Sequence, residues 1–372
     1  MFGIKHITAG IVVILLNISP VIAGVDDPVE PLELPASFDW RDINGTDFTT
    51  PIKNQAPAPT CEAYALCASL ETLVQYEVGH PFDVDLSEAH LFFYAGGTAN
   101  WGVDLVNAVE YLMDYGVPDE GCYPDPHRQY DPSTLDSLPG WENRTVKITS
   151  YGWVDSEEIN DIKQALIDHG PLIICILNRN DFLRYRGGIY SPWNNRFSGG
   201  HVLNIVGYDD AEECWIIRNS AGEDWGEDGY ARVSYSAHSP KHPFFWDFYG
   251  PTAILWIDGT YGNFMPDVPQ VYIESPKMWH TYIHGYEFST IFQQISWIQR
   301  GVSRILGSIP IQVSATNTNR VEFYLDGDLQ FTDENEPYEW ELDTSQGLHT
   351  IEVCAYNEHN MSKDILDLYV FK

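Results

Sequence analysis

The spacing of apolar residues changes along the chain and predicts a helix early on, followed by strands. Apolar side chains recur at helical spacing in Glu62–Tyr76, and Gly79 marks the end of this segment. A helical first part followed by a strand-rich second part is typical of an α+β fold. Further along, short apolar runs predict strands at Leu172–Leu177, Val202–Val206, Trp215–Ile217 and Tyr230–Val233.

A different pattern begins near residue 261. The polar stretch with Asn263, Pro266 and Pro269, followed by Pro276, predicts a linker at 261–275. Asp326-Gly327 lies between two alternating runs and predicts a tight hairpin. Several short strands predict a small antiparallel β-sandwich over residues 276–372, although 287–306 fits neither period and is left open. The alternating runs are Ile309–Val313, Val321–Leu325, Tyr338–Leu342, Ile351–Ala355 and Ile365–Val370.

The first residues have the features of a secretory signal. Lys5 precedes the apolar run Ile11–Leu16, and Val21-Ile22-Ala23 fits a cleavage site after Ala23. The run is shorter than the roughly 20 residues of a membrane-spanning helix, although an uncleaved anchor is the alternative. We therefore expect a signal peptide at 1–23 and a short acidic segment at 24–33. The protein is expected to be secreted, extracellular or on the cell surface, without an integral membrane span after signal removal.

Composition and charge narrow the classes of function. The 372 residues are enough for two domains, and 54 acidic against 20 basic residues give a formal net charge of -34. A net negative charge of this size repels the phosphate backbone of nucleic acids and argues against nucleic acid as a partner. The 12 histidines and 6 cysteines show no metal-ligand spacing, so neither a metal nor another cofactor is expected.

Three residues of the types needed for thiol catalysis follow one another along the chain. Cys61 lies at the predicted start of a helix, where the N-terminal dipole lowers the pKa of a thiol, although a helix-start cysteine is often only structural. His201 follows Gly199-Gly200 at the predicted start of a strand, and Asn219 follows another strand. A thiolate needs an imidazole partner, and the imidazole needs a third group to orient its ring.

Six ordered blocks make residues 34–258 resemble the papain-like cysteine peptidases, the family of papain and the cathepsins. The resemblance implies a domain at 34–260 with two parts: a helical half carrying the cysteine and a β-barrel-like half carrying the histidine and asparagine. The blocks are Leu34–Arg41, Pro51–Gln55, Leu86–Glu88, Tyr185–Tyr190, His201–Tyr208 and Arg218–Tyr230.

The resemblance implies a role for each matching residue. Cys61 is expected to attack the scissile carbonyl, His201 to act as general acid and base, and Asn219 to orient the imidazole. The side-chain amide of Gln55, together with the backbone N–H of Cys61, is expected to bind the oxyanion. Gly102 falls in the family's glycine-rich loop and is expected to offer backbone to an extended peptide substrate.

The chain also departs from the family pattern. Glu62 and Ala221 stand where the family has tryptophans, and Ala58 and Ala99 replace a cysteine pair that forms a disulfide in the family. Glu62 either complements the dipole of the helix or raises the pKa of the adjacent thiol, and both interpretations stay open. Without the shielding tryptophan, we expect Asn219 to hold His201 less firmly and the thiolate–imidazolium pair to be weakened.

We therefore expect a secreted cysteine endopeptidase that hydrolyses peptide bonds through a thioester at Cys61. Its C-terminal part resembles immunoglobulin-like repeats of prokaryotic surface proteins, on the segments Val321–Gly327 and Gly347–Ile351. This part is expected to tether the enzyme to a cell-surface or polymer partner. Only about ten residues separate Ala23 from Leu34, so no full inhibitory propeptide is expected. The alternative is a catalytically weak or inactive papain-fold protein that binds peptides or acts as an adhesin, and acyl transfer would use the same residues.

Overall fold

The computed structural model describes residues 34–372 except 57, 83, 99–101, 125–136, 156, 194–195, 238–243, 246–253, 263–267, 278–279 and 289–301. The predicted signal peptide and acidic segment, 1–33, lie outside the described residues. Within the part of the chain that is described, no helix combines the length and apolarity needed to cross a membrane.

The first part of the described chain is built around the helix α1 (Cys61–Val78), which confirms the helix predicted from the apolar spacing. Most of its side chains are buried, because it is packed on several sides. It ends at Gly79, whose φ of 85° allows the left-handed turn that closes the helix. It packs against the helices α2 (Glu88–Tyr94) and α3 (Leu105–Asp114). The short 3-10 turns η1 (Glu120–Cys122) and η3 (Trp141–Arg144) follow further along the chain.

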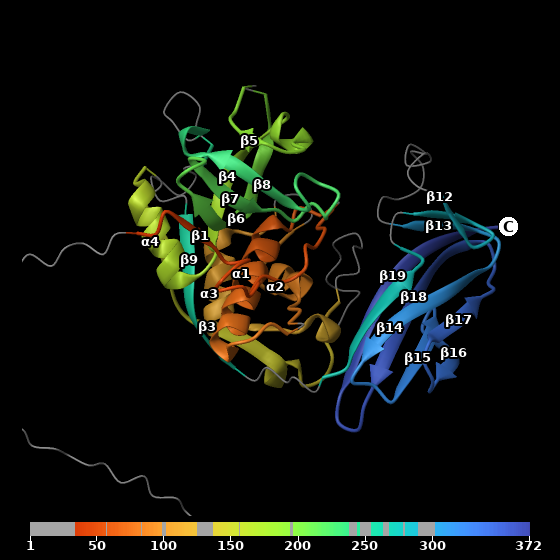
Figure 1. The fold of residues 1–372 in the computed structure, drawn as a ribbon. Coiled ribbons are helices and arrows are strands. Elements are labelled where there is room, and N and C mark those ends of the chain that lie inside the picture. Colours follow the sequence, from red (N-terminus) through yellow and green to blue (C-terminus); the bar gives the residue numbers. More distant parts are fainter. Residues whose placement is uncertain are drawn as a thin grey trace, which may run out of the picture. The chain divides into compact units, whose positions relative to one another are not determined.

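A nine-stranded sheet forms the second part and confirms all four strands predicted there. Its order is β2-β3-β9-β4-β6-β7-β8-β5, and β1 pairs with β6. Figure 1 shows the helices α1 to α3 in red and orange, with strands β4, β6, β7 and β8 in green. The helix α4 (Ile159–His169) and the turns η4 (Phe182–Arg184) and η5 (Tyr235–Ala237) complete this part. The strands are β1 (Ser37–Asp39), β2 (Val117–Pro118), β3 (Thr145–Val154), β4 (Leu172–Arg179), β5 (Ile189–Tyr190), β6 (Phe197–Asp209), β7 (Cys214–Arg218), β8 (Tyr230–Ser234) and β9 (Ile254–Gly262).

The contact between α1 and β6 positions the candidate site. Cys61 and Val202 belong to the same apolar core, and Asn204 on β6 donates its side-chain amide to the carbonyl of Ala65 at 2.9 Å. Because helix and strand are joined one turn beyond Cys61, the start of α1 is held beside His201. His201 lies inside β6 and not at its start, since the strand begins at Phe197 and includes the two preceding glycines.

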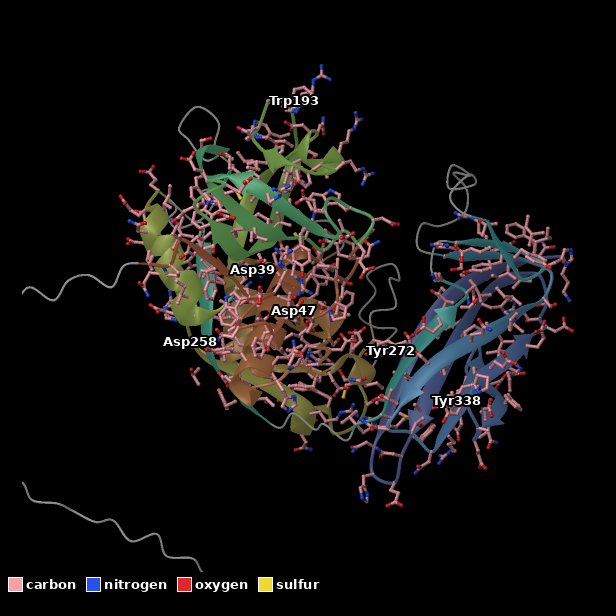
Figure 2. All side chains as sticks on the ribbon, viewed as in Figure 1. Asp39, Asp47, Trp193, Asp258, Tyr272 and Tyr338 are labelled. Atoms are coloured by element: carbon pink, nitrogen blue, oxygen red, sulfur yellow. The ribbon has the colours of Figure 1, made fainter. Side chains whose placement is uncertain are left out.

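The C-terminal part is a β-sandwich, as predicted, with a three-stranded sheet β10-β14-β17 and a seven-stranded sheet β12-β11-β13-β19-β18-β15-β16. Apolar side chains from both sheets form one core, which includes Tyr338 on β17 (Figure 2). Asp326 and Gly327 both have positive φ and form the predicted hairpin turn between β15 and β16. The strands are β10 (Gln270–Ser275), β11 (Thr281–Ile283), β12 (Tyr286–Phe288), β13 (Ser303–Leu306), β14 (Ile309–Thr316), β15 (Arg320–Leu325), β16 (Asp328–Asp333), β17 (Tyr338–Leu342), β18 (Gly347–Tyr356) and β19 (Met361–Phe371).

Two features of the sandwich differ from the sequence expectation. It is not purely antiparallel, because β13 pairs in parallel with both β11 and β19. The segment 261–275, expected to be a linker, contains the end of β9 and all of β10, which pairs with β14. The stretch 287–306, left open from sequence, contains part of β12 and all of β13.

Candidate active site

Cys61 is the first residue of α1 and is nearly buried, with 8% of its surface exposed. Its Sγ donates a hydrogen bond to Oε2 of Glu62 at 3.4 Å and accepts one from the backbone N–H of Val202. Burial, followed by the charge of Glu62, raises the pKa of the Cys61 thiol well above its usual value. The expectation that the helix start lowers this pKa is therefore wrong for the resting site, because desolvation and the adjacent carboxylate outweigh the dipole.

His201 and Asn219 are brought together by the pairing of β6 with β7. Nε2 of His201 lies 3.0 Å from Oδ1 of Asn219, which directly follows β7. The same Oδ1 accepts the backbone N–H of Ser220 at 2.8 Å, so the amide orientation has a second support. Since an amide oxygen only accepts, Nε2 must carry the proton, and the lone pair of Nδ1 is left to accept another. Burial lowers the pKa of His201, and the hydrogen bond that its Nε2 donates to Asn219 partly opposes that shift.

The replacement of the shielding tryptophan by Ala221 does not leave Asn219 in water. Asn219 is only 7% exposed, and Ala221 itself packs against the apolar core of the sheet. The hydrogen bond from Nε2 of His201 to Oδ1 of Asn219 is accordingly formed at an ordinary length of 3.0 Å.

Gln55 is tied to the segment that carries Asn219. Its backbone N–H donates to the carbonyl of Ser220 at 3.0 Å, and its side-chain oxygen accepts the hydroxyl of Ser220 at 2.6 Å. Its Nε2 donates to the carbonyl of Ala58 at 2.7 Å. A primary amide has two N–H groups, so the second can donate to an oxygen developing beside Cys61.

Gly102 lies against the carboxylate of Glu62. A Cβ on Gly102 would come within 3.1 Å of Oε1 of Glu62 and of the carbonyl of Pro59, and its φ is 73°. Its N–H and carbonyl are both bonded to Thr98, at 3.1 and 2.9 Å. A substrate strand would have to share or replace these bonds, so substrate binding at Gly102 stays a prediction. Ala99, where the family disulfide is missing, lies outside the described residues.

Comparison with known proteins decides the family. The sequence profile of the papain family cysteine proteases matches residues 34–241, more than half of the chain. The chain belongs to the papain family of cysteine proteases. A profile of bacterial Ig domains matches residues 302–353 of the sandwich.

Curated relatives agree with this membership. A viral cathepsin of Heliothis zea nuclear polyhedrosis virus is 31% identical over 57% of this chain and 55% of its own length. Zingipain-2 of Zingiber officinale is 30% identical over 56% of this chain and 91% of its own length. The chain thus spans little more than half of the viral cathepsin. The structure of digestive procathepsin L 3 from Tenebrio molitor superposes with a TM-score of 0.50 at 24% identity, over 62% of this chain and 72% of that one, and supports the fold alone.

A buried charged cluster that no sequence motif indicated joins two segments of the papain-family site. Nζ of Lys53 lies 3.0 Å from Glu71, 2.5 Å from Asp85 and 2.7 Å from Glu88. Burial raises the pKa of Glu88 to about 8, although Lys53 opposes the shift. One feature of the sequence could have pointed to this cluster: Lys53 stands only two residues before Gln55, the candidate oxyanion donor.

Arg218 is linked to the same cluster through Thr50. Its Nη2 donates to the hydroxyl of Thr50 at 3.1 Å, and Thr50 in turn donates to Glu71 at 2.5 Å. Arg218 directly precedes Asn219, so both segments of the site are fixed to the same carboxylate on α1. A small cavity between these groups is lined by Lys53, Glu71, Glu88, Asn204 and Arg218, among others.

Proposed function

We propose that the chain is a secreted cysteine endopeptidase with Cys61 as its nucleophile. The observation that carries the proposal is the bond from His201 to Asn219, which leaves Nδ1 of the imidazole as a proton acceptor. His201 directly precedes Val202, whose backbone contacts the Cys61 sulfur. A thiol, an oriented imidazole and an amide donor are the groups needed for acyl transfer through a thioester.

The proposed reaction has two steps. Cys61 Sγ attacks the peptide carbonyl while its proton passes to Nδ1 of His201, and the oxyanion is bound by Gln55 Nε2 and the Cys61 backbone N–H. The imidazolium then protonates the leaving amine as the C–N bond breaks, which yields the thioester. In the second step, His201 takes a proton from water as the hydroxide attacks the thioester carbonyl. The C–S bond breaks, the acid leaves, and the imidazolium returns its proton to the sulfur.

The other parts of the chain have proposed roles too. The peptidase domain would occupy 34–260 and the sandwich would run from β10 to residue 372, with the sandwich tethering the enzyme to a cell-surface or polymer partner. The match to bacterial Ig domains supports a binding or spacing role for the sandwich.

Cleavage of unfolded protein and of a mixed-sequence peptide library by the full chain tests this function. Wild type is expected to produce internal cleavages at pH 5, and Cys61→Ala to produce none. Cleavage that persists in Cys61→Ala would exclude Cys61 as the nucleophile, and a folded wild type without any cleavage would count against the peptidase.

A peptide-binding protein without turnover is the second candidate, and it is favoured by the bond from Cys61 to Glu62. A thiol held by a carboxylate is a poor nucleophile. This alternative predicts that wild type and Cys61→Ala bind the same peptides with equal affinity and leave them intact.

A further inference from the structure

The carboxylate of Glu62 touches the reacting atom of the site. Oε2 lies 3.4 Å from Cys61 Sγ and is its hydrogen-bond acceptor. The carboxylate also accepts the backbone N–H groups of Glu62 itself and of Val103, and Oε1 lies against Gly102. Because these contacts come from two segments of the chain, they hold the Glu62 carboxylate in place beside the Cys61 sulfur.

A thiolate and a carboxylate this close repel each other strongly. While Glu62 is charged, the proton between the two groups stays on sulfur, and Cys61 is a thiol donating to the carboxylate. When Glu62 is protonated, the repulsion is gone, the Cys61 proton can pass to Nδ1 of His201, and the Glu62 O–H can donate to the resulting thiolate. The two protonation states of Glu62 therefore correspond to a reactive and an unreactive nucleophile.

We propose that Glu62 is a further catalytic residue: Cys61 is an effective nucleophile while Glu62 holds a proton, and is held as an inert thiol once Glu62 ionises. The enzyme is thereby restricted to acidic surroundings. This inference rests on the proposed function, of which it describes the regulation.

The groups that face Glu62 support this direction. Burial raises the pKa of Glu62 above its usual 4.5, although the hydrogen bonds from its own backbone N–H, from Cys61 and from Val103 partly oppose the shift. The neighbouring charge of Asp104, before α3, adds a smaller contribution that raises this pKa. Cys175 on β4 also feels the charge of Glu62, but burial raises its pKa to about 12, so it stays a neutral thiol at physiological pH. On the far side of Cys61, burial lowers the pKa of His201. The loss of reactivity should therefore begin at a higher pH than the ionisation of an ordinary glutamate.

The test measures the rate at which iodoacetamide alkylates Cys61 in the full chain between pH 4 and pH 9, with the site assigned by peptide mass spectrometry. In wild type the rate should fall at least tenfold as pH rises from 5 to 7.5. Glu62→Gln keeps the shape and an accepting oxygen but cannot ionise. It should show no fall in this interval and react at least tenfold faster than wild type at pH 7.5.

Two matched variants sharpen the result. Asp104→Asn, which keeps a good helix cap, removes a charge that raises the Glu62 pKa, so the fall should move to lower pH. Glu110→Gln removes an exposed charge from α3, and its pH profile should superimpose on that of wild type.

A wild-type rate that does not fall over this interval, or a Glu62→Gln profile equal to or below wild type at pH 7.5, overturns the inference. If Glu62→Gln fails to fold, the wild-type fall and the Asp104→Asn shift decide alone.

The readout separates this inference from the proposed function. Alkylation needs no peptide substrate, so a pH-dependent thiol without any peptide cleavage would contradict the peptidase and leave Glu62 as the controlling group. Peptide cleavage by an enzyme whose Cys61 reactivity is the same in wild type and Glu62→Gln would support the peptidase and contradict the role of Glu62.

Discussion

The ammonium of Lys53 lies 3.0 Å from Oε1 of Glu71, a fully buried carboxylate on the central helix. The other carboxylate oxygen of Glu71 accepts from Thr50, which is bonded to Arg218. Gln55 and Asn219 each stand within two residues of one of these cations. The charged cluster therefore sets the distance between the segment that carries the amide donor and the segment that orients the imidazole.

Removing the cation of this cluster should destabilise the fold. Lys53→Met leaves Glu71, Asp85 and Glu88 without their common partner, and breaking a buried pair in this way costs about 3–5 kcal/mol. Urea denaturation at pH 7.5 measures the change. Lys372→Met is the control, since its ion pair with Asp343 is exposed and should contribute less than about 0.5 kcal/mol. Equal midpoints for the two variants would show that the cluster carries no stability.

His90 should make the fold sensitive to acid. It is fully buried among aromatic rings, with Tyr94 stacked at 4.2 Å and Trp141 at 4.4 Å, and neither ring nitrogen has a hydrogen-bond partner among the described residues. Burial lowers its pKa to about 3 from the usual 6.5. The unfolded chain binds the proton first, so the contribution to stability is present above pH 6.5 and is lost as pH falls towards 3.

The size of this effect follows from the shift. Between pH 7 and pH 4, wild type should lose about 3 kcal/mol more stability than His90→Phe, which has no proton to bind. Urea midpoints at the two pH values give the comparison. A wild type and a variant that lose the same stability would show that His90 is already able to take up a proton in the folded state.

Gln55 should contribute to the rate and not to the binding of substrate. Gln55→Ala removes an oxyanion donor and should lower kcat by about 10²–10³ with KM little changed, since the donor acts on charge that develops in the transition state. Ser220→Ala keeps the donor and loses only the 2.6 Å bond that fixes its side chain, so its loss should be smaller. A Gln55→Ala enzyme with wild-type kcat would remove Gln55 from the mechanism.

Asn219 should act through the imidazole. Its bond raises the pKa of His201, so Asn219→Ala should lower that pKa further and reduce kcat about 10- to 100-fold through a misplaced ring. The His201 titration can be followed by NMR, and the exposed Asn143→Ala serves as control. If the titration of His201 is the same in Asn219→Ala and wild type, the positioning role is wrong.

The elements that sequence predicted best are those with a strict period. The alternation in β14, β15, β17 and β18 follows directly from one buried face, whereas α1 is buried on several sides and was marked by apolar residues at helical spacing. The hairpin turn at Asp326-Gly327 was equally predictable, because a turn with two positive φ angles favours these residue types. The short strand β10 was hidden by the prolines on either side of it and by its few residues. The parallel pairing of β13 depends on long-range contacts that local pattern does not encode.

The candidate site was predictable only in its residue types and order. Motif blocks pointed to Cys61, His201 and Asn219, but the sequence could not show that Glu62 accepts from the Cys61 sulfur. Glu71 and Glu88 look like solvated charges in a helical sequence, and only the packed fold shows that they are buried around Lys53. His90 was likewise indistinguishable from a surface histidine, since Trp141, which helps to bury it, comes from a distant part of the sequence.

The central claim is that Cys61 is the nucleophile of an assembled papain-family site. Intact mass of the reduced, folded full chain after treatment with an epoxysuccinyl peptide at pH 5 tests it most directly, with Cys61→Ala and unfolded wild type alongside. One stoichiometric adduct is expected on folded wild type and none on either control. A folded wild type that remains unmodified, or an adduct that also forms on Cys61→Ala, would contradict it.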